Sequence, residues 1–191
     1  MTSAREVGVG ILLAAGSGSR FHGPSHKLLA EVDGRAVVSF AIDALKGAEL
    51  DYKVVVCGSV DLSALIPPEF SVLDNPLWER GMATSLQVGV SYARRLRADF
   101  VIVGLGDQPF ITASTWTKLA RITGEKLVVA TYDGMPRNPV RIDRSLFDRL
   151  PKYGDEGARQ LIHENSDSVC YVECEGSPFD IDTLEDLGRW R

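Results

Sequence analysis

A loop of small residues followed by two cations is the part of this sequence best suited to chemistry. An apolar run over residues 7–13 leads into the loop, and Arg20 and Lys27 lie at its exit. The loop reads Leu13-Ala14-Ala15-Gly16-Ser17-Gly18. Glycines let a backbone turn its N–H groups toward an anion, alanine side chains leave room for a base, and the two cations can contact phosphate oxygens. The pattern therefore indicates a site for a nucleoside triphosphate.

The loop matches neither of two better-known phosphate-binding motifs. A dinucleotide-binding fingerprint would have a third glycine where Phe21 stands. A Walker motif would continue as Gly-Lys-Ser/Thr, whereas here Gly23 is followed by Pro24. The alternative is a glycine-rich turn that binds nothing. Because two cations stand at the exit of the loop, we favour a nucleotide that is held by a different arrangement.

Asp107 follows a strongly apolar strand predicted over residues 99–105, within the segment Gly106-Asp107-Gln108-Pro109. Ligands of open α/β sheets bind at the carboxyl ends of the strands, which is where Asp107 should emerge. Magnesium bound to a nucleotide takes one or two protein carboxylates and completes its shell with phosphate oxygens and water. Asp107 is therefore a candidate magnesium ligand, and the alternative is a turn residue before Pro109.

Asp182 is a candidate for a second carboxylate at the same site. It lies in the segment Asp180-Ile181-Asp182-Thr183-Leu184-Glu185, shortly before a predicted C-terminal helix. Asp182 and Glu185 also have nearly the spacing of a capping box, so Asp182 could simply cap that helix. The spacing alone leaves the two interpretations equal.

Two other segments begin predicted helices. Asn75, Gly81 and Ser85 lie around the start of one helix, whose free N–H groups favour an anion. Ordinary capping explains these residues about as well. The segment Gly154-Asp155-Glu156-Gly157-Ala158-Arg159 presents two acids and an arginine at another helix start. Asp155 could cap that helix, whereas Arg159 could hold an acidic group of a substrate.

The histidines and cysteines do not indicate metal or covalent chemistry. Gly23 and Pro24 separate His22 from His26 and prevent the regular helix that would align them on zinc. The three cysteines have neither an even number nor a zinc-like spacing. The sequence contains no Gly-x-Ser-x-Gly elbow, and nothing marks a cysteine as a nucleophile. A covalent enzyme intermediate is therefore not expected.

Strand-like and helix-like segments alternate along the chain, which predicts an α/β fold with a mainly parallel sheet. We expect strands at residues 7–13, 53–57, 69–73, 99–105, 126–131, 140–142 and 169–172. We expect helices at residues 37–46, 82–93, 113–122, 144–150, 157–164 and from 183 onward. Prolines make the part beyond Gly134 irregular, and we expect it to supply substrate-binding loops and a small edge hairpin within a single domain over residues 1–191.

Composition narrows the classes of partner. The 191 residues are enough for one ordinary domain, and the formal net charge of −5 without a basic stripe argues against binding nucleic acid or an anionic membrane surface. The N-terminus lacks the pattern of a signal peptide, and no apolar run is long enough to cross a bilayer. We expect reduced cysteines, a cytoplasmic location and small-molecule substrates.

Taken together, six segments resemble the MobA-like nucleotidyltransferase family, and in particular its molybdenum cofactor cytidylyltransferase branch. The resemblance covers nearly the whole chain. It rests on Leu13 to Gly16 with Arg20 and Lys27, Gly81 to Leu86, Gly106 to Pro109, Asn138-Pro139-Val140, Gly154 to Arg159, and Asp180 to Leu187. It implies a three-layer Rossmann-like fold that binds a nucleoside triphosphate through residues 13–18, Arg20, Lys27, Asn75, Gly81, Ser85 and Gly106.

The resemblance also implies chemistry for the candidate residues. Asp107 and Asp182 would hold Mg²⁺ or Mn²⁺, and Arg20, Lys27 and Asp107 would be the catalytic groups. An Ala-Ala-Gly loop is associated in this family with cytidine, so Ala15 favours CTP as the co-substrate. The enzyme would transfer CMP to the terminal phosphate of molybdopterin, with release of pyrophosphate, and would contact a molybdoenzyme transiently. The acceptor would be oriented by Asn138, Pro139, Asp155, Gly157, Ala158 and Arg159.

Two alternatives stay open beside this reading. One is a nucleotidyltransferase for another phosphorylated acceptor, such as a sugar, polyol or phospholactate. The other is a non-catalytic protein that delivers the molybdenum cofactor. The chain also departs from the family pattern, because residues 21–26 make the step from Arg20 to Lys27 longer than usual.

Overall fold

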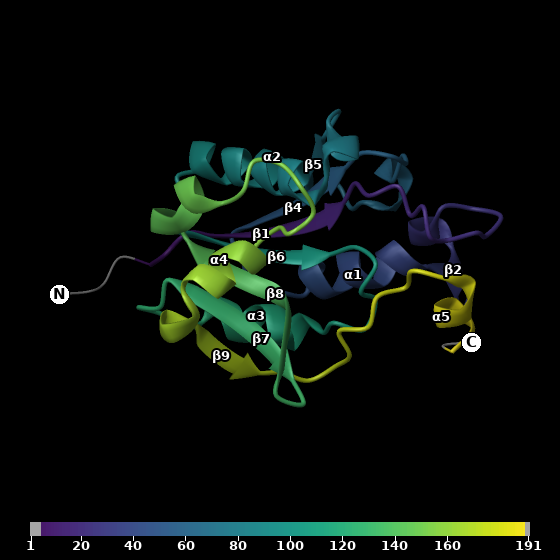
Figure 1. The fold of residues 1–191 in the computed structure, drawn as a ribbon. Helices are drawn as coiled ribbons and strands as arrows, with labels where there is room; N and C mark the ends of the chain where they lie inside the picture. Colours follow the sequence, from purple (N-terminus) through teal and green to yellow (C-terminus); the bar gives the residue numbers. More distant parts are fainter. Residues whose placement is uncertain (1–4, 190–191) are drawn as a thin grey trace.

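The computed structural model describes residues 5–189, which form a sheet of seven strands with helices on both faces (Figure 1). The strand order is β5-β4-β1-β6-β8-β7-β9. The strands are β1 (Gly8–Ala14), β4 (Tyr52–Cys57), β5 (Ser71–Asp74), β6 (Phe100–Leu105), β7 (Leu127–Tyr132), β8 (Met135–Asp143) and β9 (Cys170–Glu173). The predicted α/β fold with a mainly parallel sheet is confirmed.

β1 lies at the centre of the parallel part of the sheet. It pairs in parallel with β4 on one side and with β6 on the other. All seven of its residues are buried. A strand that is covered on both faces reads as a continuous apolar run, which is why its position could be predicted from the sequence. Its carboxyl end delivers the loop of small residues.

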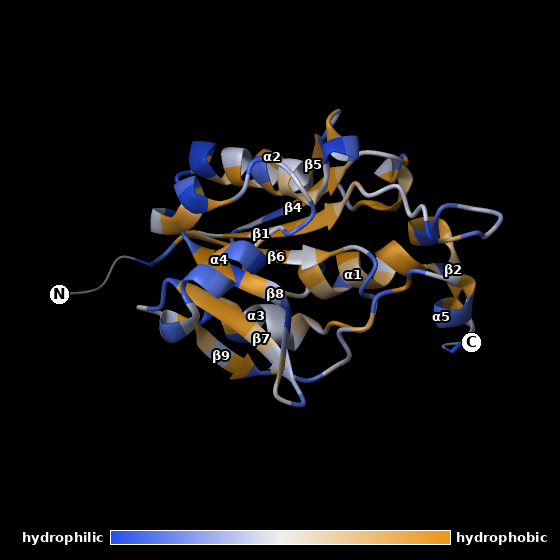
Figure 2. Ribbon diagram, in the orientation of Figure 1, coloured by the Kyte–Doolittle hydropathy of each residue, from blue (hydrophilic) through white to orange (hydrophobic). Residues whose placement is uncertain are grey.

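The helices form two layers around this sheet. They are α1 (Val37–Lys46), α2 (Met82–Arg95), α3 (Ala113–Ala120), α4 (Arg159–Glu164) and α5 (Leu184–Gly188). The apolar sides of α1 and α3 pack on one face of the sheet, and those of α2 and α4 pack on the other. Figure 2 shows apolar strands between helices of mixed polarity, as expected when each helix buries one side.

The hairpin expected at an edge of the sheet is placed differently. β7 and β8 form a hairpin, but β8 lies between β6 and β7, and β9 is the outer strand. β8 pairs with β6 only through residues 140–143. Pro136 and Pro139 precede that part, so neither interrupts the pairing with β6, which explains how a central strand accommodates them. A separate two-stranded hairpin is formed by β2 (Glu31–Val32) and β3 (Arg35–Ala36).

The C-terminal segment returns to the carboxyl edge of the parallel strands. The N–H of Ile181 donates to the backbone oxygen of Asp107 at 2.9 Å. Ile181 is fully buried in a small apolar cluster with Phe21, Val37 and Leu187. This cluster brings the last helix beside the loops that follow β1 and β6. Among the described residues, no helix is long and apolar enough to span a membrane.

Candidate active site

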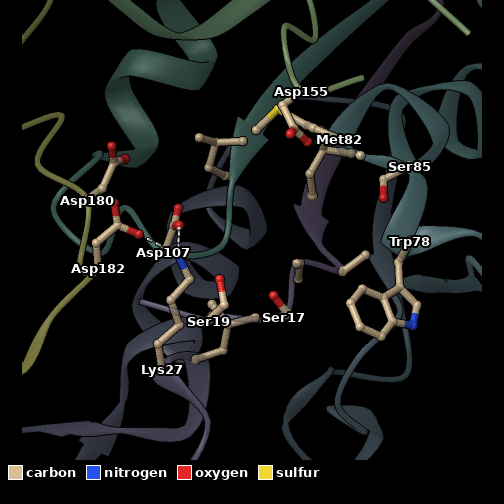
Figure 3. Close-up of a pocket in the computed structure, with 18 of the residues that line it drawn as sticks. Ser17, Ser19, Lys27, Trp78, Met82, Ser85, Asp107, Asp155, Asp180 and Asp182 are labelled. Atoms are coloured by element: carbon tan, nitrogen blue, oxygen red, sulfur yellow. Dashed lines mark hydrogen bonds and ion pairs between the residues drawn. The ribbon is translucent and has the colours of Figure 1, made fainter. Parts of the chain in front are cut away.

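A cavity of about 560 Å³ lies where β1 and β6 end, and the loop of small residues forms one of its walls. Figure 3 shows Lys27, Asp107, Asp180 and Asp182 at one end of this cavity and Trp78 at the other. Residues that sequence reasoning proposed and that line the cavity are Leu13, Ala14, Ala15, Gly16, Ser17, Gly18, Arg20, Lys27, Gly81, Ser85, Asp107, Asp155, Arg159 and Asp182.

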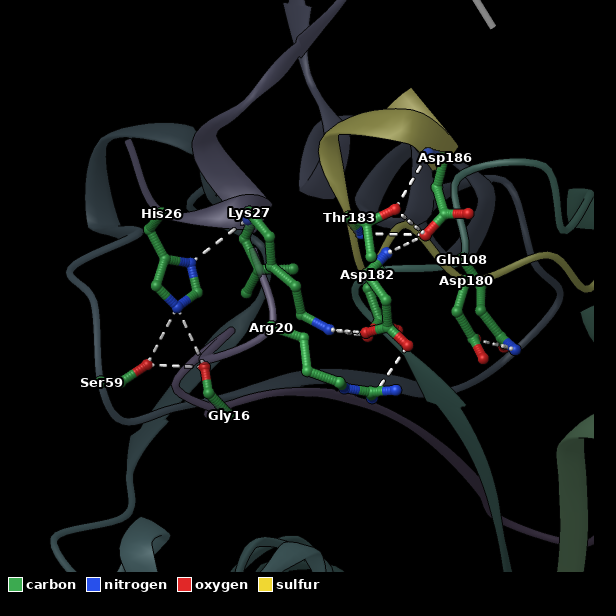
Figure 4. A network of polar contacts seen from close by, with 12 residues as sticks. Gly16, Arg20, His26, Lys27, Ser59, Gln108, Asp180, Asp182, Thr183 and Asp186 are labelled. Atoms are coloured by element: carbon green, nitrogen blue, oxygen red, sulfur yellow. Dashed lines mark hydrogen bonds and ion pairs between the residues drawn. The ribbon is translucent and has the colours of Figure 1, made fainter. Parts of the chain in front are cut away.

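Lys27 stands between the two candidate metal ligands. Its Nζ lies 2.5 Å from Oδ2 of Asp107 and 2.8 Å from Oδ1 of Asp182. The other oxygen of Asp182 forms an ion pair with Nη2 of Arg20 at 2.8 Å. The Lys27 side chain is only 11% exposed, whereas that of Arg20 is 75% exposed. The network in Figure 4 therefore joins three separate parts of the chain around one buried ammonium.

Charge holds this network together. Burial by itself would lower the pKa of Lys27, but the carboxylates of Asp107 and Asp182 outweigh it and raise that pKa above its usual value. Lys27 is therefore fully protonated at neutral pH. Partial burial and the neighbouring Asp107 carboxylate raise the pKa of Asp180 to about 6, although Gln108 donates a hydrogen bond to it. The cavity thus concentrates acids that need cations.

Asp182 is available for this network because another residue caps the last helix. Thr183 is the N-cap of α5, and its hydroxyl oxygen accepts from the N–H of Asp186. The Asp186 carboxylate accepts in turn from the N–H of Thr183, which completes a capping box. The capping box suspected for Asp182 and Glu185 therefore lies one residue further along, and Asp182 bonds to Lys27 and Arg20 instead.

The donor set fits a divalent cation. Oδ1 of Asp107 is buried and has no hydrogen-bond partner, which leaves a carboxylate oxygen unsatisfied beside the cavity. The Lys27 ammonium shows that a positive group fits between Asp107 and Asp182. Within residues 5–189, no group of three or more His, Cys, Asp or Glu is arranged to hold a metal. Two carboxylates are sufficient for magnesium when phosphates complete its shell.

The loop of small residues is fastened through its carbonyl oxygens. The N–H of Ser59 donates to the oxygen of Ala15 at 3.1 Å, and the Ser59 hydroxyl donates to the oxygen of Gly16 at 2.7 Å. Gly18 has a φ of +63°, a conformation that favours glycine. Gly58 packs so closely on Ala15 and Trp78 that a Cβ there would lie within 2.9 Å of both. The loop is therefore shaped by close packing from outside the cavity.

Asp155 caps a helix, but not the one that follows it. Its Oδ1 accepts from the N–H of Met82 at 3.2 Å, at the start of α2. The oxygen of Gly154 accepts from the N–H of Ala83 at 2.9 Å. Gly81 adopts a φ of +100°, and a Cβ there would lie 2.5 Å from the oxygen of Gly154. The segment 154–159 thus closes one side of the cavity and places Arg159 on its lining.

Six residues proposed for the site lie outside the lining of the cavity. They are Asn75, Gly106, Asn138, Pro139, Gly157 and Ala158. Asn75 is buried, and its amide donates to the hydroxyls of Thr84 and Ser85 at 2.9 and 2.8 Å. Gly106 packs beneath the loop, where a Cβ would lie 3.1 Å from Ala14. Asn75 and Gly106 therefore support residues of the lining without reaching the cavity.

Sequence reasoning missed several residues that do line the cavity. Trp78, Met82 and Asp180 are the most distinctive of them. Trp78 lies in the short 3₁₀ segment η3 (Trp78–Arg80), immediately before α2. Asp180 belongs to the segment that suggested Asp182, so its place before a candidate ligand was the available signal. Nothing in the spacing of Trp78 could have indicated an active-site residue.

Known proteins resemble this chain in sequence along most of its length. The family model described as the MobA-like NTP transferase domain matches residues 10–169. The purine catabolism protein PucB of Bacillus subtilis is 26% identical over 197 residues, which cover 96% of this chain and 95% of PucB.

Two solved structures share the fold. Rv0371c of Mycobacterium tuberculosis superimposes with a TM-score of 0.82 at 24% identity, covering 97% of this chain and 98% of Rv0371c. A nucleotidyl transferase from Methanothermobacter gives a TM-score of 0.81 at 21% identity, covering 96% of this chain and 95% of that one. A further structure of Rv0371c is a complex with manganese, with a TM-score of 0.77 at 22% identity and coverage of 96% of this chain and 97% of that one.

Proposed function

The chain belongs to the MobA-like NTP transferase family, and from this premise we propose that it transfers CMP from CTP to the terminal phosphate of a molybdopterin-type acceptor. Pyrophosphate is the second product. The observation that carries the proposal is the position of Lys27, which is held by Asp107 and Asp182 in the cavity beside the loop of small residues. A triphosphate and a divalent cation need this combination of charges.

The proposed reaction is a direct displacement at the α-phosphorus of CTP. An oxygen of the acceptor phosphate forms a bond to that phosphorus, and the bond to the bridging oxygen breaks, so the electron pair leaves with pyrophosphate. Because a phosphate monoester is already ionised near neutral pH, no protein base is required. The protein's contribution is to position the two phosphates and to stabilise the charge that moves onto pyrophosphate.

Each part of the cavity has a role in this reaction. The loop from Leu13 to Gly18 binds the nucleotide, and the cations of Arg20 and Lys27 neutralise the phosphates. Asp107 and Asp182 would hold Mg²⁺ or Mn²⁺, which would supply further neutralisation of the triphosphate. The manganese complex of Rv0371c supports the use of a divalent cation in this fold.

The choice of CTP and of the acceptor rests on particular residues. Ala15 follows Ala14 on the lining of the cavity, and this pair favours cytidine by its resemblance to the cytidylyltransferase branch. Arg159 lines the same cavity and is exposed, so it can contact an acidic acceptor. Asn138, Pro139, Gly157 and Ala158 do not line the cavity, so their proposed part in acceptor binding is to shape the segments around it. We also propose a cytoplasmic protein of one domain that contacts a molybdoenzyme transiently.

The experiment that tests this function measures pyrophosphate release. Molybdopterin, or its metal-loaded form, is mixed with CTP, GTP, ATP or UTP, first with Mg²⁺ and then with EDTA. We expect release with CTP that EDTA abolishes. A preference for GTP would contradict the role given to Ala15. Release only with a sugar or polyol phosphate would reassign the acceptor, and nucleotide binding without release would favour a delivery protein.

A further inference from the structure

His26 occupies a position that the proposed reaction does not use. It immediately precedes Lys27 and is the last residue of the segment 21–26 that separates Arg20 from Lys27. Its ring is partly buried, in contrast to the exposed His22 and His163. Figure 4 shows the ring between Gly16, in the loop of small residues, and the segment that carries Lys27. The ring therefore joins two parts of the cavity wall.

The two ring nitrogens of His26 have different partners. Nδ1 accepts from the N–H of Leu28 at 3.2 Å, which caps the 3₁₀ segment η1 (Lys27–Leu29). Nε2 lies 3.0 Å from the oxygen of Gly16 and 3.2 Å from Oγ of Ser59. Because Nδ1 accepts, the proton of the neutral ring must be on Nε2, which donates toward Gly16 and Ser59.

The surroundings favour the neutral ring. Burial and the nearby Lys27 ammonium lower the pKa of His26, although the hydrogen bonds to the backbone of Gly16 and Ser17 oppose this shift. A protonated ring would carry a hydrogen on Nδ1, facing the N–H of Leu28, and the cap of η1 would be lost. One neutral tautomer therefore makes both connections at once.

We propose that His26 is a positioning residue that fixes the loop of small residues relative to the ammonium of Lys27. The inference rests on the proposed function, since it assigns the loop to the triphosphate. One side of the ring holds the oxygen of Gly16, which the Ser59 hydroxyl also holds, and the other side holds the segment that begins with Lys27. The loop and the catalytic cation are thereby kept at one separation before the nucleotide arrives.

Substitutions can separate the two connections. His26→Phe keeps a ring but removes both nitrogens. His26→Asn keeps an acceptor near the position of Nδ1, and His26→Gln places an amide N–H near the position of Nε2. Ser59→Ala removes the other hydrogen bond to Gly16. His22→Gln is the matched control, because His22 is exposed.

The dissociation constant of CTP with Mg²⁺, measured by calorimetry without acceptor, is the main measurement. We expect His26→Phe to raise the dissociation constant of CTP about tenfold or more. His26→Gln, His26→Asn and Ser59→Ala should each raise it less. In turnover, the KM for CTP should rise while the KM for the acceptor stays within about twofold. CTP binding by His26→Phe that equals wild type, measured on a folded variant, would overturn the inference.

A second measurement does not depend on nucleotide. Nitrogen NMR of the imidazole rings distinguishes the two neutral tautomers, and the chain has only three histidines to assign. We expect His26 to carry its proton on Nε2 at pH 7.5. A proton on Nδ1 would refute the assigned hydrogen bonds. If wild type binds no nucleotide while His26 shows the expected tautomer, the proposed function fails and the two connections of the ring stand.

Discussion

Replacing Lys27 with methionine is the sharpest test of the charge arrangement. Methionine keeps much of the side-chain volume but removes the ammonium that Asp107 and Asp182 share. The two carboxylates would then face each other in a partly closed cavity without a cation between them. We expect Lys27→Met to lower the free energy of unfolding at pH 7.5 and to abolish most activity.

The magnitude follows from the distances. The two oxygens that contact Lys27 lie 2.5 and 2.8 Å from its Nζ, so they cannot be more than 5.3 Å apart. Two like charges at about 5 Å repel by about 3 kcal/mol when the effective dielectric constant is about 20. Breaking a buried ion pair by removing one partner typically costs about 3–5 kcal/mol. Because Asp107 and Asp182 are 17% and 19% exposed, solvent screens part of this, and we expect a loss of about 2–4 kcal/mol.

The loss should respond to a divalent cation with a definite sign. Mg²⁺ supplies positive charge where Lys27→Met removes it, so about 10 mM Mg²⁺ should stabilise the variant more than it stabilises wild type.

Urea unfolding at pH 7.5, with and without Mg²⁺, measures these differences. Lys46→Met is the matched control, because Lys46 pairs with Glu69 at 3.0 Å on the surface, where both side chains are about half exposed. It should change the free energy of unfolding by less than about 1 kcal/mol, with or without Mg²⁺. The reasoning fails if Lys27→Met behaves like this control and does not respond to Mg²⁺.

Three further predictions concern single residues. Asp107→Asn should fold normally but lose at least about 100-fold in pyrophosphate release; turnover within tenfold of wild type would remove Asp107 from the metal site. Because the pKa of Asp180 is raised from 3.8 to about 6, ionisation of this carboxyl destabilises the fold progressively as the pH rises between those values, and fully above them. Asp180→Asn should therefore raise the free energy of unfolding at pH 8 by up to about 1–2 kcal/mol after screening, and change it little at about pH 3. Gly81→Ala should cost about 2 kcal/mol or more in thermal unfolding, because φ is +100° and the oxygen of Gly154 blocks the Cβ; an unchanged melting temperature would contradict it.

The parts of the fold that were predicted well are those that local pattern determines. The buried run of β1 and the apolar side of α1 are visible in the sequence because each element meets the core along its whole length. Thr112 is the N-cap of α3, and its hydroxyl oxygen accepts from the N–H of Thr115, as a threonine directly before a helix commonly does. Such features depend on neighbouring residues alone.

The place of β8 could not be predicted in this way. Its prolines argued against a central strand, since proline cannot donate to a neighbouring strand. The structure avoids the conflict by pairing β6 with residues 140–143 only. The Asp133-Gly134 turn, with both residues at positive φ, is a hairpin signal that could have been used. The turn predicts a hairpin but not its neighbours. The pairing of the whole sheet places the hairpin between β6 and β9.

The site shows the same division between local and tertiary information. Asp107 could be proposed because it follows an apolar strand, and Lys27 because it is a cation at the exit of the loop of small residues. Asn75 could not be distinguished from a ligand-binding residue, because an asparagine before a helix serves either purpose. The three hydrogen bonds of its side chain, with Thr84, Ser85 and the backbone N–H of Leu77, are known only from the structure.

Asp182 shows why a single residue of register decides chemistry. Asp182 with Glu185 and Thr183 with Asp186 are both acceptable capping pairs, so the sequence could not choose between them. The choice is made by Ile181, which is fully buried and donates to the backbone of Asp107. Because Ile181 is held in the core, Thr183 lies at the helix start and becomes the cap, and the carboxylate of Asp182 lies beside Lys27. The apolar contacts of Ile181 therefore determine that Asp182 lies near Asp107.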